Sequence, residues 1–361
     1  MTAISDTTHE RDVAAAAQRL LDAALGAADL LAVFLGDRLG WYTDLRDNGP
    51  ATPGELASRT STSERYAREW LEQQAVTGLL AVEDDGGERR YRLPAAAAEV
   101  LTDPHSLSYV GPLARMLAAS AMQLPALLDA YRTGGGVSWA QLGDHARESQ
   151  ADMNRPWYEH ALAPALAGVG PLHARLSRPG ARIADVGCGA GWSTIALARA
   201  YPDAVIEGFD VDAPSIALAR SNATAAGLAD RLRFTVLDGA ELPAQGLDVV
   251  FLFECLHDMP RPVEVLRAAH DALGEDGTVV VMDEAVAEHF TAPGDELERL
   301  MYGFSLLVCL PDGMAHPPSA GTGTVLRPGV LERYAREAGF TRVDVLPVEE
   351  FGFWRFYELT R

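Results

Sequence analysis

Three glycines alternate with other residues in the stretch IADVGCGAGWST. Gly187, Gly189 and Gly191 follow an apolar run, and Asp185 precedes them by two positions. Glycines carry no Cβ, so they let the backbone come close to a ligand. A dinucleotide-binding loop would need its third glycine at Trp192, and a phosphate-binding loop would need a Lys-Ser/Thr pair. The loop fits neither pattern, and the neighbouring acid suits a ligand with an ammonium group.

Two more acids stand at the ends of the next expected strands. Asp210 lies in GFDVD, nineteen positions after Gly191, about where a ribose-binding acid belongs in a nucleotide-binding sheet. A carboxylate there accepts hydrogen bonds from both ribose hydroxyls. Asp238 lies in VLDGAEL, where it can accept a hydrogen bond from an adenine amino group. A nucleoside joined to an amino acid, without phosphates, would satisfy all three acids.

A histidine follows the fourth expected strand, in the stretch FECLHDMPRP. Histidine is the side chain best matched to proton transfer near neutral pH, so His257 is the candidate general base. The alternative is that His257 caps the following helix or serves packing. Asp283 and Glu284, at the end of the fifth strand, are candidates for a group that orients it. These acids, with Glu254 and Asp258, also leave Mg²⁺ as an alternative, but no metal is predicted, because ligand count without geometry decides little.

An open α/β sheet would bring these residues together. Five β-rich runs alternate with helical stretches from residue 181 onward, which indicates a parallel sheet covered on both faces. Ligands bind such sheets at the carboxyl ends of the strands. The tail adds a helix, PGVLERYAREAGF, and two runs, TRVDVLPV and FWRFYELT, which should pair antiparallel at the edge.

Residues 285–325 form an insertion after the fifth strand, with an apolar helix-like run and a Pro/Gly-rich loop. Such a segment is typical of a lid over an apolar pocket, and a helix that packs in a dimer is the alternative. Soft and aromatic side chains indicate an apolar or aromatic acceptor. The candidate acceptor-site residues are Trp157, Tyr158, Met301, Tyr302, Phe304, Cys309 and Met314, although Trp157 and Tyr158 also suit a packed helix face.

The first hundred residues have a different pattern. Ala/Leu-rich sequence at 9–40 predicts one or two amphipathic helices. Two short helices and a hairpin follow at 51–94, which is a winged-helix pattern. A DNA-binding regulator would carry positive charge here, whereas the chain has a net charge of −21 and no lysine, and its expected second helix holds Glu64, Glu69 and Glu72. A packing and dimerisation module is therefore favoured over a nucleic-acid partner.

Length and composition limit the number of domains and the cellular location that can be expected. A chain of 361 residues is suited to two domains. No run approaches the roughly 18 apolar residues of a membrane span, so no membrane association is expected. The start of the chain shows no signal peptide, and three scattered cysteines indicate no disulfide framework. A cytoplasmic location is expected.

The motifs ADVGCGAG, GFDVD and LDGAEL, in this order and spacing, resemble those of class I S-adenosylmethionine-dependent methyltransferases. The winged helix extends the resemblance to small-molecule O-methyltransferases of plant and actinobacterial type, which dimerise through that region. The resemblance implies a Rossmann-like seven-stranded sheet behind a mainly helical winged-helix domain. It implies a dimerisation domain at 1–105, a helical connector and substrate roof at 106–165, and a catalytic domain at 166–361.

The resemblance also assigns residues to the cofactor. Asp185 and the glycines would face the methionine part, Asp210 the ribose, and Asp238 with Gly239 the adenine. The implied cofactor-binding residues are Asp185, Gly187, Cys188, Gly189, Gly191, Asp210, Val211, Asp238, Gly239, Phe253 and Glu254.

The segment LHDM is similar to the HDW segment of plant-type O-methyltransferases, whose histidine is the general base. His257 would then take the acceptor proton, while Met259 stands where the family has tryptophan. We expect methyl transfer to an oxygen, hydroxyl or carboxylate, of a natural-product-like small molecule, with S-adenosylhomocysteine as product. The alternatives are N- or C-methylation, a reaction that retains the cofactor without transferring methyl, and, last, a DNA-binding regulator.

Overall fold

The computed structural model describes residues 3–84, 86–349 and 351–361. The chain forms two compact units that divide after Ala118, inside helix α6 (Pro112–Met122). The segment predicted as a connector, 106–165, is thus shared between the two units. No helix in the described residues has the length and apolar character needed to cross a membrane.

The first unit has the helix–helix–hairpin order of a winged helix. Thr52 and Glu55 form a capping box that starts α3, because each side chain accepts a hydrogen bond from the other's backbone N–H. Trp41, Tyr42 and Trp70 pack together in the core of this unit. Asp85, in the expected turn of the wing, lies outside the described residues. The elements are α1 (Ala3–Arg38), α2 (Trp41–Asn48), α3 (Pro53–Thr60), α4 (Glu64–Val76), β1 (Ala81–Glu83), β2 (Arg90–Arg92) and α5 (Ala95–Thr102).

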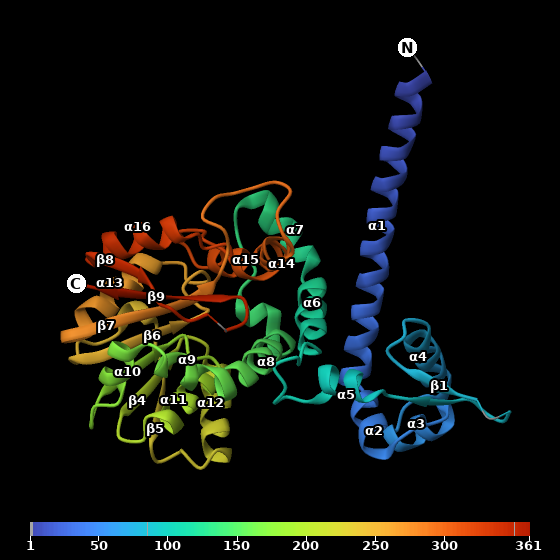
Figure 1. The fold of residues 1–361 in the computed structure, drawn as a ribbon, viewed down its shortest axis with the longest axis horizontal. Coiled ribbons are helices and arrows are strands. Elements are labelled where there is room, and N and C mark those ends of the chain that lie inside the picture. Colours follow the sequence, from blue (N-terminus) through green and yellow to red (C-terminus); the bar gives the residue numbers. More distant parts are fainter. Residues whose placement is uncertain (1–2, 85, 350) are drawn as a thin grey trace. The chain divides into compact units, whose positions relative to one another are not determined.

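The second unit is built on a seven-stranded sheet in the order β5-β4-β3-β6-β7-β9-β8, which confirms the predicted architecture (Figure 1). The first five of these strands run parallel, and β9 pairs antiparallel with both β7 and β8 at the edge, as the tail pattern predicts. The strands are β3 (Arg182–Val186), β4 (Val205–Asp210), β5 (Leu232–Val236), β6 (Leu247–Phe253), β7 (Leu273–Glu284), β8 (Arg342–Val345) and β9 (Trp354–Thr360).

Helices cover both faces of the sheet and enclose two apolar cores. On one face pack α13 (Pro262–Ala272) and α16 (Pro328–Ala338). On the other face lie α9 (Ala163–Ala167), α10 (Gly170–Leu176), α11 (Trp192–Ala200) and α12 (Ala213–Ala225). The central strands are buried on both sides, so their runs are continuously apolar rather than alternating. Strand β3 lies between β4 and β6, so the chain reverses its order there and the carboxyl ends of β3 and β6 meet at the switch point.

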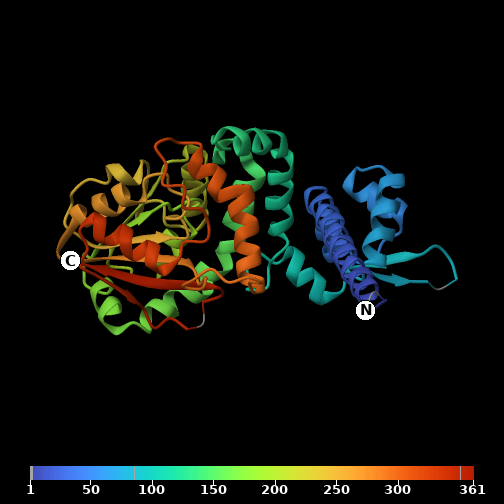
Figure 2. The same ribbon diagram turned by 90° about the horizontal axis from the view of Figure 1, so that it is seen from above.

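The insertion folds against the helices that precede the sheet (Figure 2). It contains α14 (Glu296–Phe304), a π-helical turn η3 (Ser305–Cys309) and α15 (Leu310–Met314). The helices before the sheet are α7 (Leu124–Thr133), α8 (Trp139–Trp157) and the π-helical turn η1 (Tyr158–Leu162). The Tyr131 hydroxyl donates to the Leu306 carbonyl at 3.0 Å, which joins α7 to the insertion.

A second joint lies between the start of α8 and α15. The Val137 N–H donates to the Pro311 carbonyl at 3.0 Å, and the Trp139 N–H donates to Asp312 Oδ1 at 2.7 Å. Gly136 permits this approach, because a Cβ there would lie 2.1 Å from the Pro311 oxygen. The glycine run before α8 thus allows two backbones to meet, and we call these contacts the α8–α15 seam.

Candidate active site

Asp185, at the end of β3, is buried, and only one of its two carboxylate oxygens accepts hydrogen bonds from the described residues. Ser193 and Thr194, in the first turn of α11, donate their hydroxyls to Asp185 Oδ2 at 2.7 and 2.6 Å. The other oxygen, Oδ1, is buried without a hydrogen-bond partner among the described residues. Burial raises the pKa of Asp185 to about 6. A buried acceptor without a donor is destabilising, so this oxygen fits an ammonium group supplied by a ligand.

The glycine loop after β3 presents its backbone to the same space. Gly187, Gly189 and Gly191 all have positive φ, which other residues adopt at a cost. A Cβ on Gly187 would meet Cys255, and one on Gly191 would meet Ala219, whereas Gly189 has open space at that position. Gly189 is therefore the point at which a ligand can approach the loop. The Cys188 thiol is buried behind it.

Asp210, at the end of β4, holds this loop in place. Its carboxylate accepts from the N–H groups of Gly189 and Asp212, each at 2.8 Å, and burial raises its pKa. A carboxylate has four lone-pair positions, so capacity for a ribose hydroxyl remains. Val211 beside it is exposed.

Asp238 differs from its predicted setting. Its Oδ1 accepts from Ala240 N–H at 2.9 Å, but its Oδ2 is held by Arg261 at 2.6 Å. Gly239 lies tightly against Val186, since a Cβ there would be 2.9 Å from that side chain. Arg261 is a residue that the sequence pattern does not indicate. Asp238, Asp210 and the glycine loop lie at the ends of three neighbouring strands, β5, β4 and β3.

Beyond β6 the chain enters a second, more charged region. Phe253 stacks on Phe251, and Glu254 adopts a φ of 52°. The Glu254 carboxylate reaches α8, where Asn154 Nδ2 donates to it at 2.5 Å. Burial raises the pKa of Glu254 to about 7. Asn154, in the stretch MNRPWYEHAL, thus ties α8 to the end of β6.

His257 lies at the centre of this region and is 3% exposed. Its Nδ1 is 2.9 Å from Asp283 Oδ1 and 3.3 Å from Glu284 Oε2, while Nε2 is 3.3 Å from Asp258 Oδ1. Burial lowers the pKa of the imidazole, but the charges of Asp283, Glu284 and Asp258 outweigh it and raise the pKa well above its ordinary value. Burial in turn raises the pKa of Glu284.

The partner of His257 was left open by the sequence, with Asp283 and Glu284 as candidates. Both stand at the end of β7 against the imidazole. Because Nδ1 faces Asp283, the proton-accepting lone pair of the neutral ring lies at Nε2. This arrangement suits a general base whose ring orientation is fixed by the contact between Nδ1 and Asp283.

The residues predicted for the acceptor site fall in different surroundings. Cys309, at the end of η3, is buried near His257 and Asp258. Met301 is buried, Phe304 is half-buried, and the hydroxyl of the partly exposed Tyr302 accepts from Arg327 at 3.4 Å. Met314 is half-buried at the end of α15.

The last residue of α8, Trp157, and the first residue of η1, Tyr158, both pack against the core of the second unit. Trp157 contacts Phe351 and Trp354, and Tyr158 packs on Phe253 at 5.8 Å between ring centroids. Tyr158 is buried, whereas Trp157 is half-buried.

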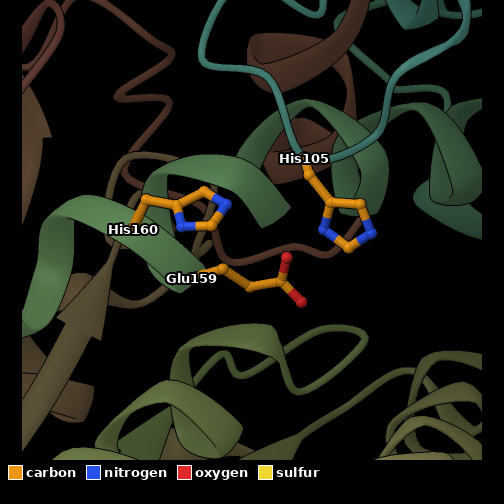
Figure 3. Close-up of side chains that lie close together, drawn as sticks. All are labelled: His105, Glu159 and His160. Atoms are coloured by element: carbon orange, nitrogen blue, oxygen red, sulfur yellow. The ribbon is translucent and has the colours of Figure 1, made fainter.

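The π-helical turn η1 takes part in contacts between α8 and α11. Glu159 and His160 project from this turn (Figure 3). Glu159 accepts from Arg155 at 3.1 Å, and the Arg155 guanidinium stands 4.1 Å from the Trp192 ring. This connects α8 to the first residue of α11, directly after the glycine loop.

One further contact fixes α8 to the end of β4. Arg147 is buried and pairs with Asp212 at 2.7 Å and Asp144 at 2.6 Å. Asp212 follows Asp210 by two positions, so α8 is fixed to the end of β4 as well as to β6. No sequence signal distinguishes Arg147 from the other arginines.

Comparisons with known proteins show similarity to methyltransferases. A family model described as "Methyltransferase domain" matches residues 177–306, and one described as "Rv2258c-like winged HTH domain" matches residues 27–103. O-methyltransferase SfmM3 of Streptomyces lavendulae is 30% identical over 91% of this chain and 96% of its own length. The solved structure of the mitomycin 7-O-methyltransferase MmcR is 25% identical, with a TM-score of 0.72 over 98% of this chain and 99% of that one.

A third relative matches over a shorter stretch. The 27-O-demethylrifamycin SV methyltransferase of Amycolatopsis mediterranei is 31% identical over 44% of this chain, and the match spans 58% of that enzyme's length.

Proposed function

The chain belongs to the S-adenosylmethionine-dependent O-methyltransferases, and we propose that it methylates a hydroxyl or carboxylate oxygen of a natural-product-like small molecule with His257 as general base. Its cofactor is S-adenosyl-L-methionine, and its second product is S-adenosyl-L-homocysteine. We propose that Asp185, Asp210 and the glycine loop hold this cofactor in the arrangement described above, with Phe253 and Glu254 closing the side toward β6.

The observation that carries the base assignment is the two-sided setting of His257. Asp283 holds Nδ1 at 2.9 Å, so the ring cannot rotate without losing a buried charged hydrogen bond. Nε2 then faces the side where Asp258 and Cys309 lie. The carboxylates raise the pKa of the imidazole, which stabilises the protonated ring after it has taken a proton.

The chemistry divides between cofactor and protein. The bound cofactor supplies a methyl group on a sulfonium, which is electrophilic without help from the protein. His257 accepts the proton from the acceptor oxygen at Nε2, and Asp283 balances the charge that develops on the ring. The end of β6 adjoins the end of β3, so the base and the cofactor loop share one edge of the sheet. Holding both reactants in line supplies much of the remaining acceleration.

The proposed acceptor is largely apolar. The insertion contributes buried Met301 and Cys309 at or near the strand ends, and these soft side chains suit an apolar or aromatic ring. Two relatives are named for oxygen 27 of demethylrifamycin SV and oxygen 7 of mitomycin. A largely apolar acceptor that carries the oxygen to be methylated is consistent with both names and with these side chains.

The test is a methyl-transfer assay on a panel of phenols, naphthols, carboxylic acids and amines with mass detection of the product. We expect one oxygen acceptor to gain a methyl group in the wild-type protein and in His270→Ala, a matched variant on α13 whose histidine contacts Asp271. We expect His257→Ala to lose most of that turnover. Turnover of amines alone, unaffected by His257→Ala, would replace this proposal with N-methylation.

We also propose that the winged helix joins two copies of this chain. The first part of α1 is exposed, with large apolar side chains at Leu20, Leu21 and Leu25, each more than half exposed. An apolar helix face of this size is unfavourable in water. Light scattering at micromolar concentration should give twice the chain mass for the wild type and a lower mass for Leu20→Glu/Leu25→Glu. A monomeric wild type would refute the dimer.

The charges of the winged helix favour this role over DNA binding. In α4, Arg65 and Arg68 each pair with a glutamate of the same helix. In the hairpin, Arg90 and Arg92 pair with Glu55 and Glu83. These arginines are neutralised by neighbours, so they offer little net charge to a phosphate backbone. Salt-dependent binding to duplex DNA at physiological salt would contradict this proposal.

A further inference from the structure

His257 takes part in a second cluster besides its contacts with the end of β7. A ring nitrogen of His257, a carboxylate oxygen of Asp258 and the Cys309 sulfur all lie within 4.8 Å of one another. His257 and Cys309 are buried, whereas the Asp258 side chain is 35% exposed. The cluster therefore brings together nitrogen, oxygen and sulfur donors with a path to solvent through Asp258.

The donor set selects a class of metal ion. Nitrogen, carboxylate oxygen and thiolate sulfur together are ligands of Zn²⁺, which binds them at about 2.0–2.3 Å. Mg²⁺ and Ca²⁺ prefer oxygen alone, so the thiol disfavours them. Side-chain shifts of about 1 Å would bring donors at this separation into a tetrahedral shell. Three protein ligands leave the fourth position open, as in sites that exchange a ligand.

The surroundings of the imidazole match those of a zinc-binding histidine. Such histidines almost always donate their other ring N–H to a carboxylate, which fixes the ring and its tautomer. Here Asp283 contacts Nδ1 at 2.9 Å, and Nε2 faces Asp258 at 3.3 Å. Asp258 Oδ1 is a buried oxygen without a hydrogen-bond partner among the described residues. A carboxylate oxygen in this position is a ready acceptor for a cation.

The opposite side of the ring is a poorer site. His257, Asp283 and Glu284 also lie within 4.8 Å of one another, but all three are nearly fully buried. They contain no sulfur donor, and the carboxyl groups of Asp283 and Glu284 both face the same ring nitrogen, Nδ1. A metal would have to displace the hydrogen bond that orients the imidazole.

We propose that His257, Asp258 and Cys309 form an inhibitory Zn²⁺ site. Zinc binding displaces the protons of Cys309 and, where present, of the His257 Nε2, and the metal then occupies the lone pair that methyl transfer requires. The metal-binding part of this proposal stands whether or not His257 is the base of methyl transfer.

The direct test is a titration of the full chain with Co²⁺ without oxygen, followed by absorption spectroscopy. We expect a thiolate-to-cobalt charge-transfer band in the near ultraviolet at one ion per chain, and Zn²⁺ should displace it. Cys309→Ser should abolish the band, whereas Cys255→Ser, a matched cysteine whose thiol faces the Val186 carbonyl, should keep it. Asp258→Asn should keep the band but weaken binding about 10-fold or more, and Asp283→Asn should weaken it about 10–100-fold.

Further measurements separate this proposal from the proposed function. Zn²⁺ should inhibit methyl transfer by the wild type, a chelator should restore it, and Cys309→Ser should resist inhibition. If Cys309→Ser no longer binds S-adenosylhomocysteine, the substitution has disturbed the site as a whole. The zinc site is then tested by whether Asp258→Asn weakens cobalt binding. Absence of a charge-transfer band in the wild type, or its loss in Cys255→Ser, would overturn the zinc site and leave the methyl-transfer assay unaffected.

Discussion

The carboxyl edge of the sheet has two halves that are built from different interactions. At the ends of β3 and β4, Asp185 and Asp210 accept hydrogen bonds from hydroxyl and backbone N–H groups, which carry no formal charge. At the ends of β6 and β7, His257 faces the carboxyl groups of Asp258, Asp283 and Glu284. Neutral donors fix a position, whereas surrounding charges also set a protonation state. The first half is thus suited to holding a ligand and the second to moving a proton.

The largest effect that would separate the halves is expected for His257→Ala. Loss of a general base should lower kcat about 10²–10⁴-fold. Affinity for S-adenosylhomocysteine should change less than about twofold, because the cofactor contacts lie on the other half. Steady-state kinetics and calorimetry measure the two quantities on the same preparation. A parallel loss of both would show that the halves are not independent.

The complementary change is Asp210→Ala. A hydrogen bond to a charged group contributes about 1.5–3 kcal/mol, so affinity for S-adenosylhomocysteine should fall roughly 10–150-fold. At saturating cofactor, kcat should stay within a few-fold of the wild type. Glu207→Ala is the control, since Glu207 is on the same strand but pairs with Arg233. Unchanged affinity in Asp210→Ala, measured calorimetrically, would remove Asp210 from the cofactor site.

The pH dependence of catalysis tests the charged half alone. Below its raised pKa the imidazole holds a proton and cannot act as base, so kcat/KM should rise with pH through a pKa above neutral. Asp283→Asn removes a negative charge and so lowers the pKa of His257. The rise of kcat/KM with pH should therefore move about 1–3 units toward lower pH. Glu284→Gln should move it in the same direction but by less, because Asp283 contributes more than Glu284 to the raised pKa of His257. Equal shifts in both variants would contradict the assignment of Asp283 as the positioning residue.

The smallest effect concerns the neutral half. Asp185 has a pKa of about 6, so it loses its charge as the pH falls through that value. If it holds the cofactor's ammonium group, affinity for S-adenosylhomocysteine should fall by at most about tenfold per pH unit below pH 6. Asp185→Asn should bind more weakly at neutral pH and show a flatter dependence. Calorimetry from pH 5 to 8 measures this, and identical profiles in both proteins would exclude Asp185 as the titrating group.

The same difference explains what could be predicted from the sequence. In the half at β3 and β4, each candidate residue lies at the end of a strand or directly after it, so Asp185, the glycine loop and Asp210 are recognisable by local spacing. The parallel sheet follows from the alternation of apolar runs with helices, and the antiparallel pair follows from the closeness of the last two runs, whereas the strand order was not predicted. The side-chain partners of these acids could not be predicted from local spacing. Arg261, which donates to Asp238, follows a different strand and belongs to no local pattern.

The charged half could be predicted only in part. His257 and the acids at the end of β7 were recognisable as groups at strand ends. Asn154 and Arg147 come from α8, and Cys309 from the insertion, so tertiary packing alone brings them to the sheet. No periodicity reports such contacts, because a helix keeps its amphipathic pattern whichever of its polar side chains is buried.

The α8–α15 seam has a consequence for the opening of the insertion. The amides of Val137 and Trp139 are bonded to Pro311 and Asp312, so each can exchange its proton with solvent only while α15 is lifted away. Deuterium uptake at these two amides therefore reports how often the insertion opens. Because α15 directly follows Cys309, the same opening would expose the neighbourhood of His257, and the opening must occur at least as often as these amides exchange.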